Sequence, residues 1–352
     1  MVVDKADGAG YVVPMDSIGL LSVGDVRSWS VVYQWGLELV RAIQTIETPV
    51  LTALIKSITH LGSAGIFILA IALEYWCINE KKGCRLALLV IFSAWLNGAL
   101  KTLLRKPRPY FLDPSVGKIT AAGYGLPSGH SQLSLTFWAA ALTGPLGKGR
   151  AWLVTGLITL IIAFTRLYLG VHFPTDVLGG WFLALATLGA YYFLLPPLER
   201  FLAARGTRGP MIGAAAAAFV MNALYPGNSH YGALFLGFSA GYLLMRAYFP
   251  FSAAAEAPNL PKTFLGLNSG LVVRGLRLVL GLAGTTLLFY GLKGLLGRGS
   301  LLGAGNYELS RFLHYGILSL WVSAGAPWLF LRLGLAVPQA KQKNEEKREG
   351  GI

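Results

Sequence analysis

Three polar stretches interrupt a largely apolar sequence, and their residue types suit the binding and attack of a phosphate. The first, KTLLRKPRPY at 101–110, places Lys101 seven residues before Arg108, between Pro107 and Pro109. The two prolines restrict the backbone around Arg108, and a guanidinium held in a fixed direction can bind an oxyanion through two donors. For this stretch alone, the alternative is a helix end whose Lys and Arg side chains extend to water at the membrane interface.

The second stretch, GYGLPSGHSQLSLTFW at 123–138, places Ser128, Gly129 and His130 at the expected start of a helix. Unpaired amides and the helix dipole make such a start an anion-binding site. Gly129 would let a phosphate approach the backbone closely. The alternative is that Ser128 only caps the helix and that His130 faces the interface.

The third stretch, FTRLYLGVHFPTDVLGGW at 164–181, contains Arg166, His172 and Asp176. Arg166 lies near the end of an apolar segment, where a charge is costly and usually functional. Pro174 is favourable as a first helical residue, which puts Asp176 in the first turn. Its carboxylate can then bond one nitrogen of His172 and leave the other basic and exposed. A capping Asp beside a surface His is the alternative.

The elements that carry these stretches are expected to be membrane helices. Of the 352 residues, 54% are hydrophobic and 13% are charged, against about 25% charged in soluble domains. A span needs about 20 apolar residues. We expect nine spans, at residues 62–78, 84–104, 131–147, 150–169, 175–196, 210–225, 230–248, 274–296 and 311–334. A weaker segment, 30–58, carries charges and either inserts in part or lies along the interface.

The positions of the basic residues predict the orientation. Lys and Arg residues occur at 79–85, near 148 and at 197–209, and the positive-inside rule makes that side cytoplasmic. The loops 105–130 and 170–174 then face outward. We therefore predict a multi-pass protein of the cell (inner) membrane with its active site facing the periplasm. The net charge of +14 fits this topology better than nucleic-acid binding. The N-terminus predicts no cleavable signal peptide, so the first hydrophobic helix would act as an uncleaved signal.

Together, the three stretches supply the groups needed for phosphoryl transfer through a phosphohistidine. His172 would attack phosphorus in line while Asp176 holds it, and His130 would protonate the leaving oxygen and then activate water. The groups that would bind the phosphate oxygens are the side chains of Lys101, Arg108 and Arg166 and the amides of Ser128 and Gly129. The sequence has no cluster with metal-ligand spacing. We therefore expect a metal-free mechanism with no cofactor.

The sequence resembles the type 2 phosphatidic acid phosphatase superfamily. The family pattern is Lys-x6-Arg-Pro, Pro-Ser-Gly-His and Ser-Arg-x5-His-x3-Asp. In this sequence its three parts correspond to Lys101 to Pro109, Pro127 to His130, and Thr165 to Asp176. Thr165 replaces the usual Ser and retains a hydroxyl, so hydrogen bonding to phosphate or backbone should survive. Over residues 60–196 the resemblance implies a six-helix core, a phosphohistidine at His172, His130 as the acid and base, and no metal requirement.

The expected fold class is an all-α transmembrane bundle with a six-helix core and a C-terminal transmembrane extension. The predicted divisions are an N-terminal segment at 1–60, the catalytic core at 61–197, the extension at 198–336 and a basic cytoplasmic tail at 337–352. We interpret His230 and His314 as structural, because they lie at helix ends without a partner pattern. Two cysteines, Cys77 and Cys84, are too few for a disulfide framework or a four-ligand zinc site.

The function expected from the motifs is hydrolysis of a lipid phosphate or pyrophosphate, with the bilayer and the lipid as partners and no nucleic acid. An outward-facing site bounded by apolar helices suits a substrate whose head enters while its tails stay in lipid. The alternatives are a phosphotransferase, a phosphatase for a soluble sugar phosphate and, in a different class, a lipid or anion transporter. The headgroup, the tail and the oligomeric state are not readable from this sequence.

Overall fold

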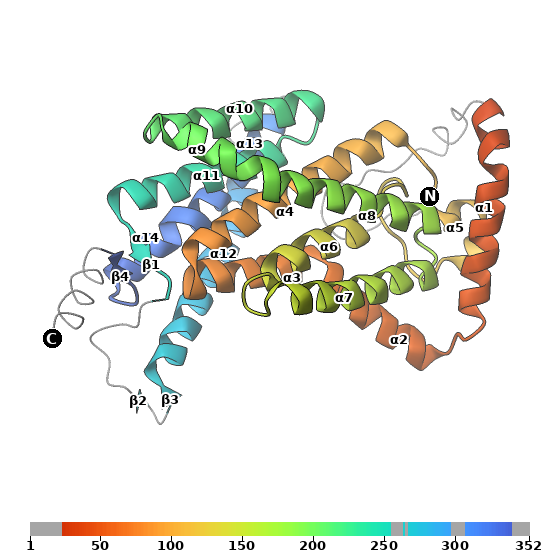
Figure 1. Ribbon diagram of the computed structural model, residues 1–352, viewed down its shortest axis with the longest axis horizontal. Helices are drawn as coiled ribbons and strands as arrows, with labels where there is room; N and C mark the ends of the chain where they lie inside the picture. Colours follow the sequence, from red (N-terminus) through yellow and green to blue (C-terminus); the bar gives the residue numbers. More distant parts are fainter. Residues whose placement is uncertain (1–22, 255–262, 265–266, 297–306, 340–352) are drawn as a thin grey trace. The chain divides into compact units, whose positions relative to one another are not determined.

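The computed structural model describes residues 23–254, 263–264, 267–296 and 307–339, and these are mostly helical (Figure 1). The predicted all-α class is confirmed. Two short antiparallel strand pairs are also present. β1 (Phe251–Ser252) pairs with β4 (Val337–Pro338), and β2 (Thr263–Phe264) pairs with β3 (Leu267–Asn268). Most of the predicted tail, residues 340–352, lies outside the described residues.

The chain forms two compact units that alternate along the sequence. Of the described residues, the first unit contains those within 23–67 and 96–190, and the second contains those within 68–95 and 191–339. The long helix α4 (Glu80–Leu104) contributes to both. The boundaries predicted from sequence at residues 60, 197 and 336 stay a prediction about domains. The N-terminal helices nevertheless belong to the same compact unit as all three polar stretches.

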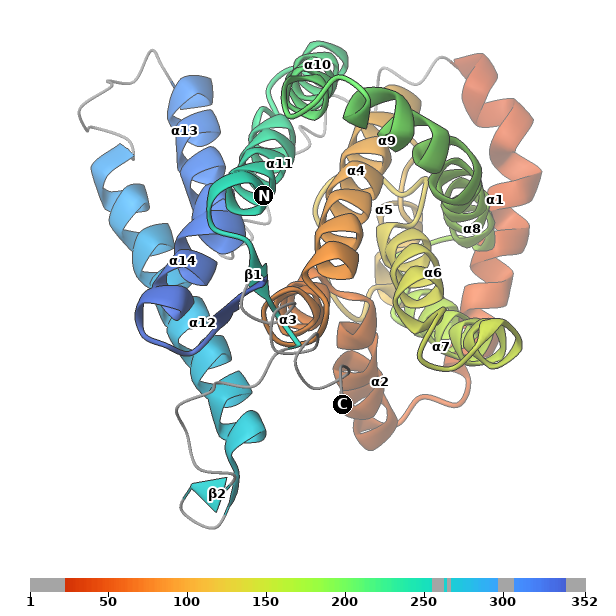
Figure 2. The same ribbon diagram turned by 60° about the vertical axis from the view of Figure 1, so that its left-hand side comes forward.

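In the first unit, helix α6 packs against both α7 and α8, and α1 crosses the ends of α7 and α8 (Figures 1 and 2). Sequence signals explain where these helices begin. Pro49 occupies the first position of α2 and Thr48 caps it, while Pro174 occupies the first position of α8. The helices and turns of this unit besides α4 are α1 (Val23–Gln44), α2 (Pro49–Ile58), a turn at Thr59–Gly62, the start of α3 (Ala64–Leu73), α5 (Pro109–Leu112), a turn at Pro114–Val116, α6 (Gly129–Leu142), α7 (Lys148–Tyr168) and α8 (Pro174–Gly189).

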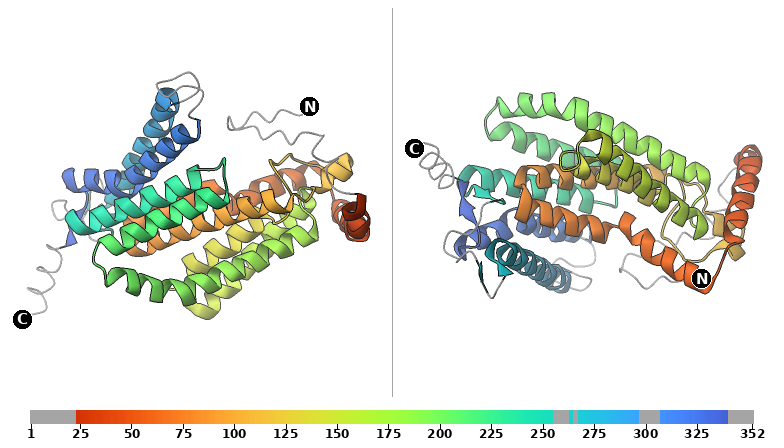
Figure 3. Two further views of the ribbon diagram at one scale, coloured as in Figure 1. Left: turned by 90° about the horizontal axis from the view of Figure 1, so that it is seen from above. Right: turned by 60° about the horizontal axis from the view of Figure 1, so that its bottom comes forward.

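In the second unit, α11 packs against α10 and α13, and Figure 3 shows α10 and α11 side by side. Gly237 and Gly241 of α11 lie directly against Ser319 and Ser323, the small-residue contact typical of membrane helices. The elements of this unit besides α4 are π-turns at Glu74–Ile78, Ala190–Leu194 and Trp321–Gly325, and the helices α9 (Leu195–Ala203), α10 (Arg208–Leu224), α11 (His230–Tyr248), α12 (Ser269–Leu296), α13 (Tyr307–Leu320) and α14 (Ala326–Arg332).

The sequence analysis considered two pairs of residues in the second unit, the two cysteines and two of the histidines. Cys77 and Cys84 are buried free thiols. His230 bonds Arg311 through Nδ1 at 2.7 Å, and His314 is buried in α13 beside Phe289. His314 lies inside α13 (Tyr307–Leu320) and not at a helix end as expected. The structural interpretation of both histidines stays a prediction.

The number of spans differs from the sequence-based expectation of nine. In the described part of the chain, four helical segments are long and apolar enough to cross a membrane: Glu80–Leu112, Lys148–Tyr168, Pro174–Ala203 and Gly270–Leu296. Pro49–Gly62 and Ala64–Ile78, bent by 47° at their junction, would make a fifth. Helices also form in four other predicted spans, but they are not long and apolar enough to meet the same criterion: 131–147, 210–225, 230–248 and 311–334. α6, for example, has 14 residues and is therefore only about 21 Å long. A multi-pass membrane protein is still indicated.

Candidate active site

Hydrogen bonds bring the three polar stretches together within the first unit. The Lys101 ammonium of the first stretch donates to the Gly125 carbonyl of the second at 2.9 Å. The Ser128 amide donates to the Asp176 carbonyl of the third at 2.8 Å. Arg108 contacts His172, which links the first stretch to the third. The convergence expected from sequence is therefore observed.

The His172 ring is fixed from both sides. Its Nδ1 lies 3.2 Å from Asp176 Oδ2, and its Nε2 lies 3.2 Å from Arg108 Nη1. A guanidinium can only donate, so Nε2 accepts and is unprotonated. Nδ1 therefore carries the proton and donates to the carboxylate. The backbone N–H of Phe173 also donates to Asp176 Oδ2 at 2.9 Å, which anchors this carboxylate at the start of α8.

Arg108 is a buried part of this site and does not extend to water, because only 3% of it is exposed. Its Nη1 donates to the Val171 carbonyl at 2.9 Å, Nη2 to Ala122 at 2.7 Å and Nε to Gly123 at 2.8 Å. These bonds leave few donors of Arg108 for an oxyanion. They place its charge directly beside Nε2 of His172.

Lys101 is held by the same loop. Its ammonium donates to the carbonyl of Tyr124 at 2.7 Å and to that of Gly125. Gly125 is required there, because a Cβ would lie 2.6 Å from the Pro107 oxygen and 2.9 Å from Asp176 Oδ2. An ammonium has three donors. Lys101 thus retains one N–H beyond its two carbonyl partners.

The start of α6 combines the two sequence interpretations of Ser128, Gly129 and His130. Ser128 caps the helix, its Oγ lies 2.9 Å from Ser131 Oγ, and its amide is bonded to Asp176 O. This differs from the prediction that the Ser128 amide binds phosphate. The amides of Gly129 and His130 lie in the first turn, where helix geometry provides no intrahelical acceptor.

Asn97 and Gln132 were missed by the sequence reasoning. The Asn97 Nδ2 donates to Gln132 Oε1 at 2.7 Å and lies 3.3 Å from the Pro127 carbonyl, and both side chains are buried. Gly129 packs on the same amide, because a Cβ there would lie 3.1 Å from Asn97 Oδ1. The pair fixes the start of α6 against α4. The sequence did contain a sign of this pair, because two amide side chains lie within apolar segments. Buried polar groups are almost always hydrogen-bonded, so each of these amides needed a partner.

Arg166 is also buried, at 3% exposure, but it is held by fewer partners than Arg108. Its Nη1 donates to Thr59 Oγ1 at 2.9 Å, and its buried Nε has no partner among the described residues. The Thr165 hydroxyl donates to the Ile162 carbonyl at 2.7 Å. The backbone bond expected for Thr165 is therefore present.

Burial and the neighbouring positive charges keep both histidines neutral. They lower the pKa of His172 well below its usual value, with Arg108, Lys101 and Arg166 as the main charges. Burial, followed by Arg166 and Arg108, lowers the pKa of His130 to about 3. The same cations act on both rings, which places His130 and His172 in one electrostatic environment.

The lowered pKa values predict a loss of stability in acid. The unfolded chain takes up protons on these histidines below about pH 6.5, while the folded chain does not. Each histidine should therefore lower the free energy of unfolding by up to about 1.4 kcal/mol per pH unit below that point. Unfolding in detergent between pH 5 and 7.5 measures this dependence. His130→Gln should give a shallower slope, and an unchanged slope would contradict the lowered pKa.

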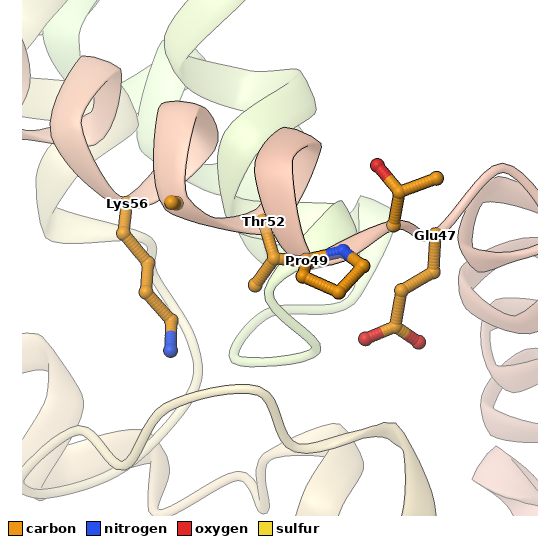
Figure 4. Close-up of a pocket in the computed structure, with 6 residues that line it drawn as sticks. Glu47, Pro49, Thr52 and Lys56 are labelled. Carbon is orange, nitrogen blue, oxygen red and sulfur yellow. The ribbon is translucent and has the colours of Figure 1, made fainter.

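A separate hollow of about 530 Å³ lies beside α2 and is distinct from the site (Figure 4). Glu47, Pro49, Thr52 and Lys56 are among the residues that line it. Glu47 is paired with Lys118 at 2.7 Å.

Within the described ranges, no three His, Cys, Asp or Glu side chains are grouped so that they could hold a metal ion.

Comparison with known proteins decides the family. The profile of the PAP2 superfamily matches residues 82–199. Phosphatidylglycerophosphatase B of Bacillus subtilis (strain 168) is 30% identical over 157 residues, which cover 41% of this chain and 75% of that protein. The chain belongs to the PAP2 superfamily. The resemblance to the type 2 phosphatidic acid phosphatases is thereby confirmed. A second profile, the transmembrane extension of PAP2 superfamily phosphatases, matches residues 229–339 and confirms that an extension is present.

This chain matches less than half of the length of two further relatives. Lipid phosphate phosphatase delta of Arabidopsis thaliana is 25% identical over 187 residues, 48% of this chain and 44% of its own length. Sphingosine-1-phosphate phosphatase 1 of Mus musculus is 26% identical over 41% of this chain and 35% of its own length. The crystal structure of a transmembrane PAP2 type phosphatidylglycerolphosphate phosphatase from Bacillus subtilis aligns with a TM-score of 0.42 and 26% identity, over 49% of this chain and 89% of that one.

Proposed function

We propose that this protein is an integral membrane phosphatase that hydrolyses a lipid phosphate or pyrophosphate monoester. The main support is the fixed His172 ring, with Nδ1 bonded to Asp176 and an unprotonated Nε2 among buried cations. The printed names of the relatives, a phosphatidylglycerophosphatase and sphingosine-1-phosphate phosphatases, support a lipid phosphate as the substrate class.

In the proposed reaction, a phosphate oxygen takes over the Arg108 Nη1 hydrogen bond that Nε2 accepts in the structure. His172 Nε2 then attacks phosphorus, and the bond from phosphorus to the leaving oxygen breaks in line. The result is a phosphohistidine, whose positive ring Asp176 stabilises. His130 gives a proton to the leaving oxygen, then takes one from water as that water attacks phosphorus and releases His172. The negative charge of a bound phosphate opposes the cations that lower the pKa of His130, so substrate binding favours its protonated form.

We propose that the phosphate oxygens are bound by donors that the protein leaves available. These are Nε of Arg166, the third N–H of Lys101 and the first-turn amides of Gly129 and His130. In this proposal, Arg108 contributes mainly charge next to Nε2, and Ser128 caps and orients the anion-binding helix start. Preorganised donors and positive charge stabilise the phosphoryl transition state. Because this chain supplies both, we propose that turnover is metal-independent.

We propose that the protein is a multi-pass protein of the inner membrane with this site at the periplasmic surface. α7 supports the orientation, because Lys148 and Arg150 are at its start and His172 follows its end. Its 21 residues measure about 31 Å, enough to cross the hydrocarbon core. The positive-inside rule places the Lys148 end in the cytoplasm. The site then lies outside, near the level at which α1 crosses the helix ends (Figure 1).

The test is phosphate release by the purified full chain in detergent with EDTA present. A panel of phosphatidic acid, phosphatidylglycerol phosphate, a sphingoid-base phosphate and a polyprenyl pyrophosphate should include at least one substrate, and orthovanadate should inhibit its hydrolysis. Glucose 6-phosphate is the soluble comparison, and an added alcohol acceptor detects phosphotransfer. Absence of release from every lipid, or release only after a divalent ion is restored, would contradict the proposed function.

A further inference from the structure

The hydroxyl of Thr59 contacts both residues that begin the third motif. It accepts a hydrogen bond from Arg166 Nη1 at 2.9 Å and lies 3.0 Å from Thr165 Oγ1. Thr59 is 6% exposed, so this contact is shielded from water. The residue lies outside the three polar stretches and outside the family match at 82–199.

One face of α2, continued by the turn after it, holds Thr59 against the end of α7. The Thr52 and Tyr168 hydroxyls are 2.8 Å apart, and Ile55 packs in a buried cluster that contains Tyr168. Positions 52, 55 and 59 recur at helical spacing and therefore share a face. The Thr59 amide donates to the Ile55 carbonyl, which continues the helical bonding into the turn. The Thr59 hydroxyl is thus fixed by the backbone and by its neighbours.

The kind of partner matters for the charge of Arg166. A carboxylate at this position would pair with the guanidinium and neutralise it. A hydroxyl accepts one N–H and leaves the positive charge available to a phosphate. Arg166 also has the charge of Arg108 as a neighbour, so like-charge repulsion acts on it and a fixed acceptor is needed to hold it.

We propose that Thr59 is a positioning residue that orients the Arg166 guanidinium toward the phosphate of the substrate, an inference that rests on the proposed function. The bond to Nη1 fixes the plane of the guanidinium, and the unpartnered Nε then has a defined direction. Catalysis would therefore depend on a residue from the N-terminal segment that precedes the matched family region.

The test compares Thr59→Val, which removes the hydroxyl at nearly constant volume, with Thr59→Ser, which keeps it. Ser57→Ala is the matched control on α2, since it loses only the bond of an exposed hydroxyl to the Ala53 carbonyl. Loss of one bond to a charged group predicts that Thr59→Val lowers kcat/KM and the affinity for orthovanadate by about ten- to a hundredfold. Thr59→Ser and Ser57→Ala should stay within about threefold of the unchanged chain. The midpoint of thermal unfolding in detergent shows that each variant is folded, and Thr59→Ala replaces Thr59→Val if valine is not accommodated.

A double-mutant cycle with Arg166→Lys identifies the partner. If Thr59 acts through the guanidinium, Thr59→Val in the Arg166→Lys background should lower kcat/KM by less than about threefold. Additive losses, an equal loss in Ser57→Ala, or a Thr59→Val protein as active as the unchanged chain would each overturn the inference. Failure of the unchanged chain to release phosphate would instead contradict the proposed function, so the two failures are distinguishable.

Discussion

Replacing His172 by alanine should lower kcat by at least about 10⁴-fold, the loss typical of removing a covalent nucleophile. His172 is 2% exposed, and its Nε2 is the unprotonated nitrogen that would attack phosphorus. Arg108 should still hold the adjacent loop through its three backbone carbonyls. Lipid-phosphate hydrolysis in EDTA measures the effect, with unfolding in detergent measured alongside.

The control for this variant is His314→Ala, which removes a buried imidazole from α13 in the second unit. Its turnover per folded molecule should equal that of the unchanged chain. A His172→Ala protein that is folded and turns over within tenfold of the unchanged chain would refute the assignment of His172 as the nucleophile.

Asp176→Asn should lower kcat by about 10²- to 10⁴-fold and change KM little, by analogy with carboxylates that orient a catalytic histidine. The side-chain oxygen of Asn can still accept the Phe173 N–H bond at the start of α8, so the fold should persist. The lost negative charge no longer stabilises the positive ring of a phosphorylated His172. The effect should therefore appear in the chemical step and not in substrate binding. Steady-state kinetics together with orthovanadate binding can separate these two effects.

Asp113→Asn is the matched control, because Asp113 also caps a short turn through Ser115 N and contacts Arg41 but lies outside the site. It should leave kcat within about twofold. Equal losses in both variants would show that Asp176 only supports the fold, and a fully active Asp176→Asn protein would contradict its proposed role.

The site residues that follow local spacing were predictable from the sequence. Asp176 is four residues after His172, and Pro174 sets the start of α8, so one turn of helix determines their contact. The bond between Arg108 and His172 joins residues 64 positions apart. The sequence predicted only that the two adjacent loops lie on the same side of the membrane, and it did not predict this bond.

Contacts without a local pattern were missed. The sequence offers no spacing rule that pairs Asn97 with Gln132 or Thr59 with Arg166, because these contacts depend on how separate helices pack. The sequence indicated nine spans, whereas four or five helical segments of the described residues have the length and composition of a span. Apolar composition does not reveal the length of a helix, and α6 has only 14 residues.

The N-terminal segment illustrates the same limit. Residues 30–58 were expected to insert in part or to lie along the interface, and they form two helices in the unit that contains the site. Gly36 lies so close to Phe173 that a Cβ would be 2.7 Å from its ring. Gln44 donates to the Tyr168 carbonyl at 2.7 Å. Both contacts support the third motif, and a Gly or a Gln in the sequence does not by itself predict such a role.

The most direct test of the central claim is to trap the phosphoenzyme. The full chain would be mixed with a lipid phosphate labelled in its phosphate group, quenched within milliseconds, digested under alkaline conditions and mapped by mass spectrometry. The account predicts an acid-labile phosphate on His172 of the unchanged chain and none in His172→Ala. A label on another residue, or steady turnover of the unchanged chain with no labelled protein, would contradict it.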